Sequence, residues 1–471
     1  MKREEIILSQ EEVNIQKEYT RRLREYYSSK GKTPKALIET FGCQQNENDS
    51  ERIKGMLAQM GYTFTDDRED ADFILFNTCA VREGAEQRVL GNLGALKLIK
   101  AKKPDLIVGI CGCMMQQEHM SKRIKSKFKH VSVVFGTHSL YSFPEIMYNA
   151  VVCDERVISH IKSEGRLCED IPVHREKAAS AWVSVMYGCN NFCSYCIVPY
   201  VRGRERSRDP EAVINEIKEL AQSGVKEITL LGQNVNSYGK DLDRDIDFAD
   251  LLLMADKIDG IKRIRFITSH PKDMTDKLIE TLPKVTKLCT QIHLPFQAGS
   301  NRILKVMNRR YTKESYLELV EKIRQKMPDA SFTTDIIVGF PGETEEDFFE
   351  TIDVIKKVRF DSVFSFIYSK RTGTPAAEME DQVPDDIKHK HFDILLDVQN
   401  KISREINETY QDKVEEIMVE GLSKNNDAFM CGRTSGGKIV NFPKDDNLSE
   451  GDFVNVKITK ISTWSLMGER I

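Results

Sequence analysis

The chain has 471 residues and a mass of 54.0 kDa, which corresponds to about three domains at roughly 150 residues each. With 40% hydrophobic and 30% charged residues, its composition excludes collagen-like and low-complexity classes, and its net charge of −4 excludes an overall basic nucleic-acid binder. The 11 cysteines are too sparse for a small disulfide-bonded scaffold and are odd in number. No stretch fits a signal peptide or a membrane span, so we expect a cytoplasmic protein without a membrane partner.

Residues 1–32 are expected to form an N-terminal helical extension. Ser9 and Glu12 have the spacing of a capping box, and a charged helical stretch follows until Gly31 interrupts it. The sequence leaves open whether this helix docks on the protein or remains a solvated tail.

Residues 33–151 alternate short apolar runs with longer helical stretches. The expected strands are 36–41, 71–77, 105–110 and 131–135, and the expected helices include 49–60 and 83–100. Such alternation is typical of βαβ units, so we predict an open α/β domain with a parallel sheet.

A polar linker with one edge strand is expected at 151–174, and a second alternating series follows within residues 175–405. Its expected strands are 182–187, 227–231, 263–268, 290–294, 332–338 and 362–368, with helices such as 210–223 and 313–326 between them. Six repeats predict a partial (β/α)6 barrel, which resembles a TIM barrel but is smaller.

The last part of the chain, residues 408–471, follows a polar helix at 384–408 and changes to short strands. These are expected at 413–420, 428–433, 438–442, 453–461 and 464–467, separated by turns rich in Gly and Asn. The pattern predicts a small antiparallel β-barrel. Its 8 Lys and Arg residues stand against 11 Asp and Glu residues, so it has no net basic charge.

The most specific motif is Cys189-x-x-x-Cys193-x-x-Cys196, directly after the first strand of the second alternating series. A zinc site would need a fourth ligand at finger or ribbon spacing, and none follows nearby. A 4Fe-4S cluster normally takes four thiolates, so three would leave one iron open to another ligand. Three unpaired structural cysteines are the alternative.

This motif on the first loop of a six-repeat barrel resembles the radical S-adenosylmethionine (SAM) enzymes. The resemblance implies that the open iron binds S-adenosyl-L-methionine and that one electron from the cluster cleaves it to a 5′-deoxyadenosyl radical. Tyr195, beside the last cysteine, would then pack against the adenine. The barrel would contain this reactive chemistry.

Three further cysteines follow the first three expected strands of the α/β domain: Cys43, Cys79 and Cys113. Sites in open α/β sheets gather beyond the carboxyl ends of parallel strands, which is where all three should lie. Their spacing alone matches no metal motif. Cys111 competes with Cys113 for the third place, and we prefer Cys113 because Gly112 frees the backbone before it.

These segments resemble the amino-terminal domain of methylthiotransferases, where three cysteines hold a second 4Fe-4S cluster. Matching segments continue along the chain, at 188–208, 231–239, 293–300 and 334–343, and residues 408–471 are similar to the RNA-binding TRAM domain. The chain is most similar to the MiaB family, which makes 2-methylthio-N6-dimethylallyladenosine beside the tRNA anticodon; segment 232–239 discriminates best. Gln45 departs from the methionine common there, but it is no ligand.

The resemblance implies one SAM as methyl donor and a second as radical source. It also implies the tRNA anticodon stem-loop as substrate, an external low-potential electron donor and a monomer. Alternatives within this class are threonylcarbamoyl-adenosine in tRNA or an aspartate of a ribosomal protein. A ferredoxin-like electron carrier and a zinc-stabilised RNA-binding module without catalysis are alternatives from other classes.

Polar residues at the expected strand ends of the barrel are candidates for holding SAM: Gln233, Asn234, Ser269, His270, His293, Gln297 and Asp335. Some of them would instead only satisfy backbone groups of loops. Arginines near the cluster motif are candidates for RNA phosphates: Arg202, Arg204, Arg206, Arg208, Arg309 and Arg310. Surface salt bridges with Glu205 and Asp209 are the alternative reading of the first four.

Overall fold

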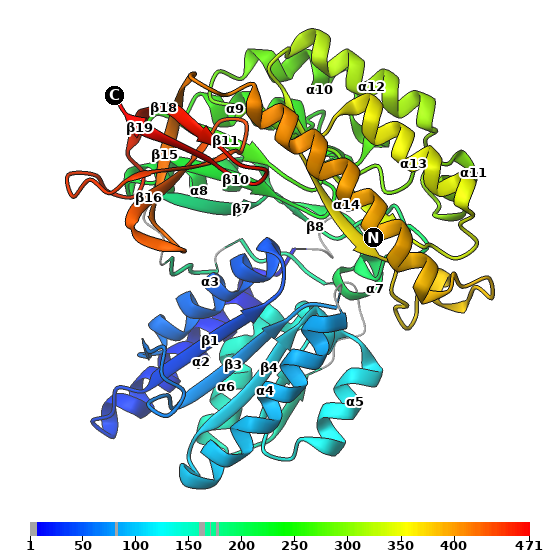
Figure 1. The fold of residues 1–471 in the computed structure, drawn as a ribbon. Helices are drawn as coiled ribbons and strands as arrows, with labels where there is room; N and C mark the ends of the chain where they lie inside the picture. Colours follow the sequence, from blue (N-terminus) through cyan, green and yellow to red (C-terminus); the bar gives the residue numbers. More distant parts are fainter. Residues whose placement is uncertain (1–6, 81–82, 160–164, 170, 176–178) are drawn as a thin grey trace. The chain divides into compact units, whose positions relative to one another are not determined.

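The computed structural model describes residues 7–80, 83–159, 165–169, 171–175 and 179–471 (Figure 1). The chain divides into two compact units. The first comprises Met1–Glu176, Met186–Asn190 and Cys196–Arg208, and the second Lys177–Val185, Asn191–Tyr195 and Asp209–Ile471. Among the described residues, no helix is both long and apolar enough to cross a bilayer.

The N-terminal helix α2 (Gln10–Ser29) is docked on the first unit. Its capping box is formed as expected, with the Glu12 amide donating to Ser9 Oγ at 3.3 Å and the Ser9 amide donating to the Glu12 carboxylate at 2.9 Å. Leu23 and Tyr27 are buried in the core, and the hydroxyls of Tyr27 and Tyr62 lie 2.7 Å apart. The structure therefore selects the docked helix over the solvated tail.

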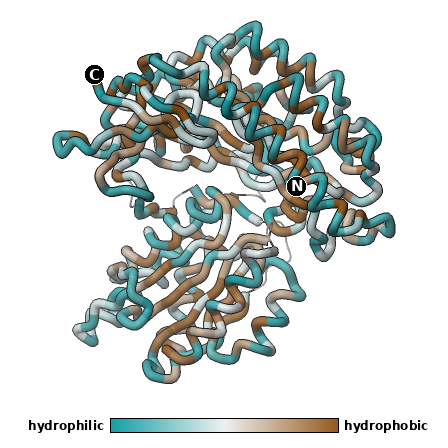
Figure 2. The backbone as a smooth tube through the Cα atoms, viewed as in Figure 1, coloured by the Kyte–Doolittle hydropathy of each residue, from teal (hydrophilic) through white to brown (hydrophobic). Residues whose placement is uncertain are grey.

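A six-stranded parallel sheet forms the centre of the first unit, in the order β2-β1-β3-β4-β5-β6. These strands are β1 (Lys35–Phe41), β2 (Thr63–Phe64), β3 (Phe73–Thr78), β4 (Ile107–Gly112), β5 (Val133–Phe135) and β6 (Val157–Ser159). Helices α2, α3 (Gln44–Gln59) and α6 (Phe143–Val152) cover one face, and α4 (Glu83–Lys102) and α5 (Glu118–Lys127) cover the other. The sheet strands are largely hydrophobic because both faces are buried (Figure 2).

The predicted α/β architecture is confirmed, with local differences. Helix α3 begins at Gln44 rather than at residue 49, because Cys43, two residues after β1 ends at Phe41, is already the N-cap of the helix. Strand β2 has two residues and is too short to predict, whereas β6 is the edge strand expected in the linker. Two 3-10 helices, η1 (Cys113–Gln116) and η2 (Thr137–Ser142), follow β4 and β5.

The second unit contains the predicted partial barrel as two three-stranded parallel sheets, β11-β10-β7 and β12-β13-β14. The strands are β7 (Ser180–Ser184), β10 (Glu227–Leu231), β11 (Arg263–Phe266), β12 (Gln291–His293), β13 (Ser331–Val338) and β14 (Ser362–Ile367). The helices are α8 (Pro210–Gln222), α9 (Phe248–Asp256), α10 (Asp276–Thr281), α11 (Asn301–Val306), α12 (Lys313–Lys326), α13 (Glu345–Val358) and α14 (Asp385–Glu408). A bridge between Ile264 and Leu288 lies where the first sheet approaches the second.

The expected strand at 182–187 is divided. Its first part is β7, and its second part, β8 (Met186–Tyr187), pairs antiparallel with β9 (Arg206–Ser207) in the first unit. The short helix α7 (Val198–Arg202) lies between β8 and β9 along the chain.

The last 64 residues of the second unit contain a closed barrel in the order β15-β16-β17-β19-β18. Its strands are β15 (Val414–Ser423), β16 (Asn426–Thr434), β17 (Ile439–Pro443), β18 (Phe453–Ile461) and β19 (Leu466–Arg470). One detail corrects the prediction of an antiparallel barrel: β17 and β19 pair in parallel to close it.

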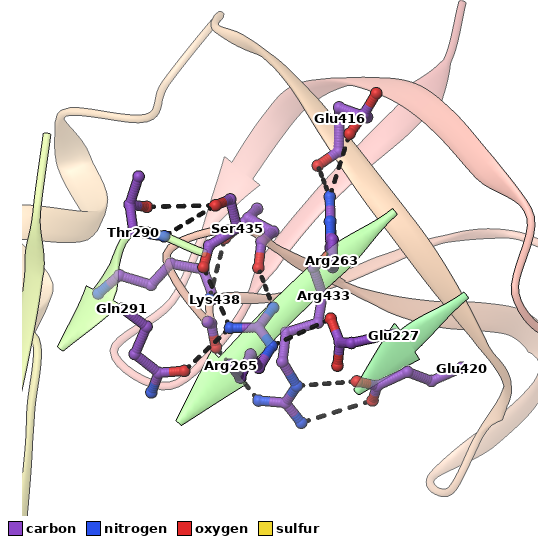
Figure 3. Close-up of polar contacts among 12 residues, drawn as sticks. Glu227, Arg263, Arg265, Thr290, Gln291, Glu416, Glu420, Arg433, Ser435 and Lys438 are labelled. Atoms are coloured by element: carbon purple, nitrogen blue, oxygen red, sulfur yellow. Dashed lines mark hydrogen bonds and ion pairs between the residues drawn. The ribbon is translucent and has the colours of Figure 1, made fainter. Parts of the chain in front are cut away.

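Two arginines of β11 hold this small barrel against the amino-terminal ends of the larger barrel's strands (Figure 3). Arg263 donates to the carbonyl of Arg433 at 2.7 Å, and Arg265 donates to the carbonyl of Thr434 at 2.9 Å. Glu227 on β10 balances the charge of Arg265 at 3.0 Å. Within the second unit, the small barrel is therefore fixed by several buried hydrogen bonds.

Candidate metal centres and active site

The three cysteines of the first unit lie at the carboxyl ends of neighbouring strands. Cys43 follows β1 and caps α3, Cys79 follows β3, and Cys113 begins η1 directly after β4. The Cys79 thiol hydrogen-bonds to Cys43 and, together with the charge of Arg202, lowers the pKa of Cys43 to about 5. Burial raises the pKa of the Cys113 thiol, and Arg202 opposes that effect. The sheet order thus brings the three sulfurs into one neighbourhood.

Cys111 and Cys113 point into different surroundings. Cys111 lies within β4, opposite Asn77 and Phe135, and packs in the apolar core beneath α2, α3 and α6. Cys113 packs instead with Ala80 and with Ile197 and Val201 of the α7 region. Gly112 permits this change because its φ is +96° and a Cβ there would lie 2.4 Å from the Thr78 carbonyl oxygen. The geometry favours Cys113 as the third ligand.

A buried ion pair stands beside these cysteines. Arg202 Nη2 lies 2.7 Å from Asp49 Oδ2, and both side chains are almost fully buried. Arg202 also interacts electrostatically with Cys43 and Cys113. Buried cationic groups near thiols favour the thiolate form that iron binds, so this donor set suits an anionic iron–sulfur cluster.

Among the described residues, no group of three His, Cys, Asp or Glu side chains is arranged to hold a single metal ion. That finding does not conflict with a cubane cluster, because each cysteine of such a cluster binds a different iron. The cysteines need to surround a cluster several ångströms wide and do not need to meet at one point.

The motif Cys189–Cys196 contributes to both units: Cys189 and Cys196 belong to the first and Cys193 to the second. In the first unit, the Asn190 amide donates to the Glu205 carboxylate at 3.1 Å. In the second unit, the Asn308 side-chain amide donates to the carbonyls of Asn191 and Phe192 at 3.1 and 2.9 Å. These bonds hold the backbone of the cysteine loop over the three residues that precede Cys193.

Ser269 and His270, in the loop that follows β11, have buried polar atoms that bond to no other described residue. Ser269 Oγ and His270 Nε2 are both buried without a hydrogen-bond partner. His270 Nδ1 accepts a bond from the Lys272 amide at 3.1 Å, so Nε2 carries the proton. Burial and the charge of Arg309 lower the pKa of His270 to about 2, which keeps the ring neutral. Buried unsatisfied donors of this kind fit a polar ligand such as SAM.

Gln233, Asn234, His293 and Gln297 lie at or just beyond strand ends as expected, whereas Asp335 lies within β13 rather than at its end. Asn234 is buried and donates to Asp273 at 2.8 Å, while Gln233 beside it is partly exposed. His293 Nδ1 lies 3.0 Å from Thr333 Oγ1, and its Nε2 lies 3.7 Å from Asp335 Oδ1. The backbone N–H of Gln297 donates to the backbone carbonyl of Asp335 at 2.9 Å. The Tyr195 ring packs edge-on against Phe340, with centroids 6.4 Å apart.

Two exposed aromatic residues of β14 were not predicted from the sequence. Phe364 lies opposite Asp335 in the sheet register, 5.8 Å from the His293 ring, and 51% of it is exposed. Phe366, two residues along the same strand face, is 38% exposed. The opposite face of the sheet is buried, as Phe332 shows by packing under Arg324 of α12. The helix-free inner face of the barrel therefore presents exposed aromatic rings.

The arginine predictions need revision. Arg202 pairs with Asp49, Arg206 donates to the Arg202 carbonyl at 3.0 Å, and Arg208 donates to Glu169 at 2.6 Å. These three and Arg309 are buried, so their guanidinium groups face the protein interior rather than a phosphate backbone. Of the six candidates, only Arg204 and Arg310 are exposed. Asp49 and Glu169, which pair with two of these arginines, were not predicted from the sequence.

Three family models match successive parts of the chain. Residues 35–136 match uncharacterized protein family UPF0004, residues 183–355 the radical SAM superfamily, and residues 408–471 the TRAM domain. The radical SAM methyltransferase TsrM from Kitasatospora setae, solved with tryptophan and a SAM analogue bound, has a similar fold with a TM-score of 0.52. Its sequence is 14% identical, and the match covers 73% of this chain and 75% of that one.

Curated relatives match over nearly the whole length. A protein of Acetivibrio thermocellus named tRNA-2-methylthio-N(6)-dimethylallyladenosine synthase is 53% identical over 470 residues, which cover 99% of this chain and 98% of that protein. A protein of the same name from Clostridium botulinum is 55% identical over 435 residues, covering 92% and 96%. The chain therefore belongs to the tRNA-2-methylthio-N6-dimethylallyladenosine synthases, the MiaB family of radical SAM enzymes with a TRAM domain.

Proposed function

We propose that this protein inserts sulfur at C2 of N6-dimethylallyladenosine, next to the tRNA anticodon, and methylates it to the 2-methylthio derivative. The observation that carries this proposal is the full-length match to synthases named for that product, at 53% identity. The protein is a radical SAM methylthiotransferase acting on tRNA, which implies a 4Fe-4S cluster and SAM.

We assign Cys189, Cys193 and Cys196 to the cluster that reduces SAM, and Cys43, Cys79 and Cys113 to a second 4Fe-4S cluster. When bound, the first cluster supplies the electron that makes SAM a radical source, and the second carries the sulfur. The first unit supports the second assignment through three thiols at adjacent strand ends and a buried cation beside them. The sequence motif supports the first assignment.

The residues at the strand ends would bind and orient SAM. His270 offers a neutral Nε2–H donor and Ser269 a hydroxyl, both buried and without other partners among the described residues. Gln233, Asn234, His293, Gln297 and Asp335 add neutral and acidic groups for the hydroxyls and the amino group of SAM, while Tyr195 would pack against its adenine. A group already desolvated in the free protein needs little reorganisation when the ligand binds.

The inner face of β14 suits the prenylated base. Phe364 and Phe366 expose aromatic rings on the strand face that also carries His293 and Asp335 across the register. A target adenine in an anticodon loop must leave its stack to be modified, and aromatic side chains replace that stacking. The dimethylallyl group adds apolar surface that the same rings can cover.

The tRNA substrate implied by the family would approach with its anticodon stem-loop, and Arg204 and Arg310 are the exposed arginines left to contact its phosphates. The TRAM barrel has a net charge of −3, so we expect it to contact RNA through a local face. We further propose that the protein receives electrons from an external low-potential donor, is a monomer and is located in the cytoplasm.

The test is nucleoside mass spectrometry of tRNA from a strain that lacks the gene. We expect N6-dimethylallyladenosine to accumulate, and the methylthio derivative to return with the wild-type gene but not with C43A or C193A. Loss of the methylthio group from threonylcarbamoyl-adenosine instead would favour the second candidate substrate. An unchanged nucleoside profile would contradict both.

A further inference from the structure

Arg309 is a buried cation whose surroundings differ from those of an ordinary structural arginine. Its Nε donates to the Tyr311 hydroxyl at 3.1 Å, its Nη2 to the Pro295 carbonyl at 2.7 Å, and its Nη1 to Cys193 Sγ at 3.5 Å. Tyr311 in turn donates to the Phe296 carbonyl at 2.7 Å, which fixes the ring and with it the guanidinium. All of these groups belong to the second unit.

No carboxylate pairs with Arg309 in the part of the chain that the structure describes; its hydrogen-bond partners there are a phenol, a carbonyl and a thiol. A buried guanidinium without a counter-charge is costly, and such groups persist where something anionic occupies the site in the functional state. The sulfur of Cys193 is the partner of Arg309 that becomes anionic when it binds iron.

Arg202 of the first unit provides a contrast within the same chain. It also interacts with two of the cysteines assigned to a cluster, Cys43 and Cys113. However, Asp49 neutralises its charge at 2.7 Å in a buried ion pair. Each set of cysteines therefore has one buried arginine, but only the arginine beside Cys193 keeps an unbalanced positive charge among the described residues.

We propose that Arg309 is a positioning residue that raises the reduction potential of the cluster held by Cys189, Cys193 and Cys196. This inference rests on the cluster assignment of the proposed function. Reduction adds one electron from the external donor and makes the cluster one charge unit more negative, while no covalent bond forms or breaks. A fixed positive charge and an N–H···S bond at a ligand sulfur both stabilise that more negative state.

The experiment measures the midpoint potential of this cluster in the full-length, iron-loaded protein without SAM, by EPR-monitored titration. R309Q removes the charge and keeps a hydrogen-bonding group, whereas R309K keeps the charge. For R309Q we expect the reduction equilibrium to fall at least tenfold, which is 59 mV for one electron. For R309K we expect a change of less than about threefold, since the cation remains.

The second cluster is the internal control, and R202Q is the matched variant. R309Q should leave the potential of the second cluster unchanged, and R202Q should leave that of the first unchanged. An R309Q protein with full iron content and an unchanged first potential would overturn the inference. If R309Q fails to retain iron, R309K decides: it keeps the cation, and a reduction equilibrium at least tenfold lower in iron-loaded R309K would also overturn the inference.

Failure of the cluster assignment is distinguishable from failure of this inference. If the assignment is wrong, C193A retains the iron content of the wild type and both cluster signals. If only the role of Arg309 is wrong, C193A loses one signal while R309Q behaves as the wild type does.

Discussion

Replacement of Arg202 by Gln should destabilise the cysteine-bearing edge of the first unit by about 3–5 kcal/mol. The side chains of Arg202 and Asp49 are 6% and 8% exposed, and their charged atoms lie 2.7 Å apart. At that distance the Coulomb attraction is about 6 kcal/mol for an effective dielectric constant of about 20. Breaking a buried pair by removing one partner typically costs about 3–5 kcal/mol, because the other charge stays buried. Among the described residues, the side-chain hydrogen bond to Asp49 that would remain comes from the uncharged Gln45 Nε2 at 3.2 Å.

Hydrogen-exchange mass spectrometry of the iron-free protein measures this loss locally. A change of about 3 kcal/mol corresponds to exchange roughly a hundredfold faster, which we expect in peptides from β1, α3 and α7. R204Q is the matched control, since Arg204 lies two residues away and is exposed; it should change exchange little. The double variant R202L/D49L should recover much of the loss, because neither charge remains buried. Equal exchange in R202Q and R204Q would show that the Arg202–Asp49 pair does not stabilise this edge of the sheet.

Three further predictions concern the backbone, the substrate and pH. G112A should abolish binding of the second cluster, since a Cβ there would lie 2.4 Å from the Thr78 carbonyl oxygen at a φ of +96°. G91A, at an open position of helix α4, is the control. Normal iron content in G112A would contradict this prediction. F364A should raise the KM for a prenylated anticodon stem-loop about tenfold or more in steady-state assays, because stacking on the base is lost. F364W should leave the KM unchanged, and so should F349A, a control at a similarly exposed phenylalanine of α13. Equal KM values for F364A and the wild type would count against an aromatic base site. Burial raises the pKa of Glu343 from 4.5 to about 8, so the folded state binds its proton more tightly than the unfolded state does. Stability should therefore fall as the pH rises from about 5 to about 8, and E343Q should lack this dependence in urea unfolding; parallel pH profiles would contradict it.

Much of the fold was predictable because the parallel strands are short apolar runs that differ clearly from the helices between them. The strand at 227–231 and the helix at 313–326 match their observed bounds, as does the capping box at Ser9. The two-residue strand β2 and the parallel closure of β17 on β19 were not predictable, since neither has a local signal.

The candidate site was predictable in its cysteines and not in its electrostatics. Cysteines at strand ends follow from local sequence, because the carboxyl ends of adjacent parallel strands meet at one edge. The partner of a charged side chain has no such local signal. Arg202 pairs with Asp49, 153 residues earlier, and Arg309 bonds to Cys193, 116 residues earlier. The closely spaced arginines at 202–208 predict a surface patch from the sequence alone, and only the folded structure shows that three of the four are buried.

The most direct test of the account uses the purified, iron-loaded protein with SAM, a low-potential reductant and a synthetic anticodon stem-loop carrying N6-dimethylallyladenosine. Mass spectrometry of the RNA should show one added methylthio group with the wild type and none with C43A or C193A, and the unprenylated stem-loop should not react. The wild type should contain about eight iron and C43A about four. Formation of the methylthio product by C43A or C193A, or its absence with a wild type that holds both clusters, would contradict the account.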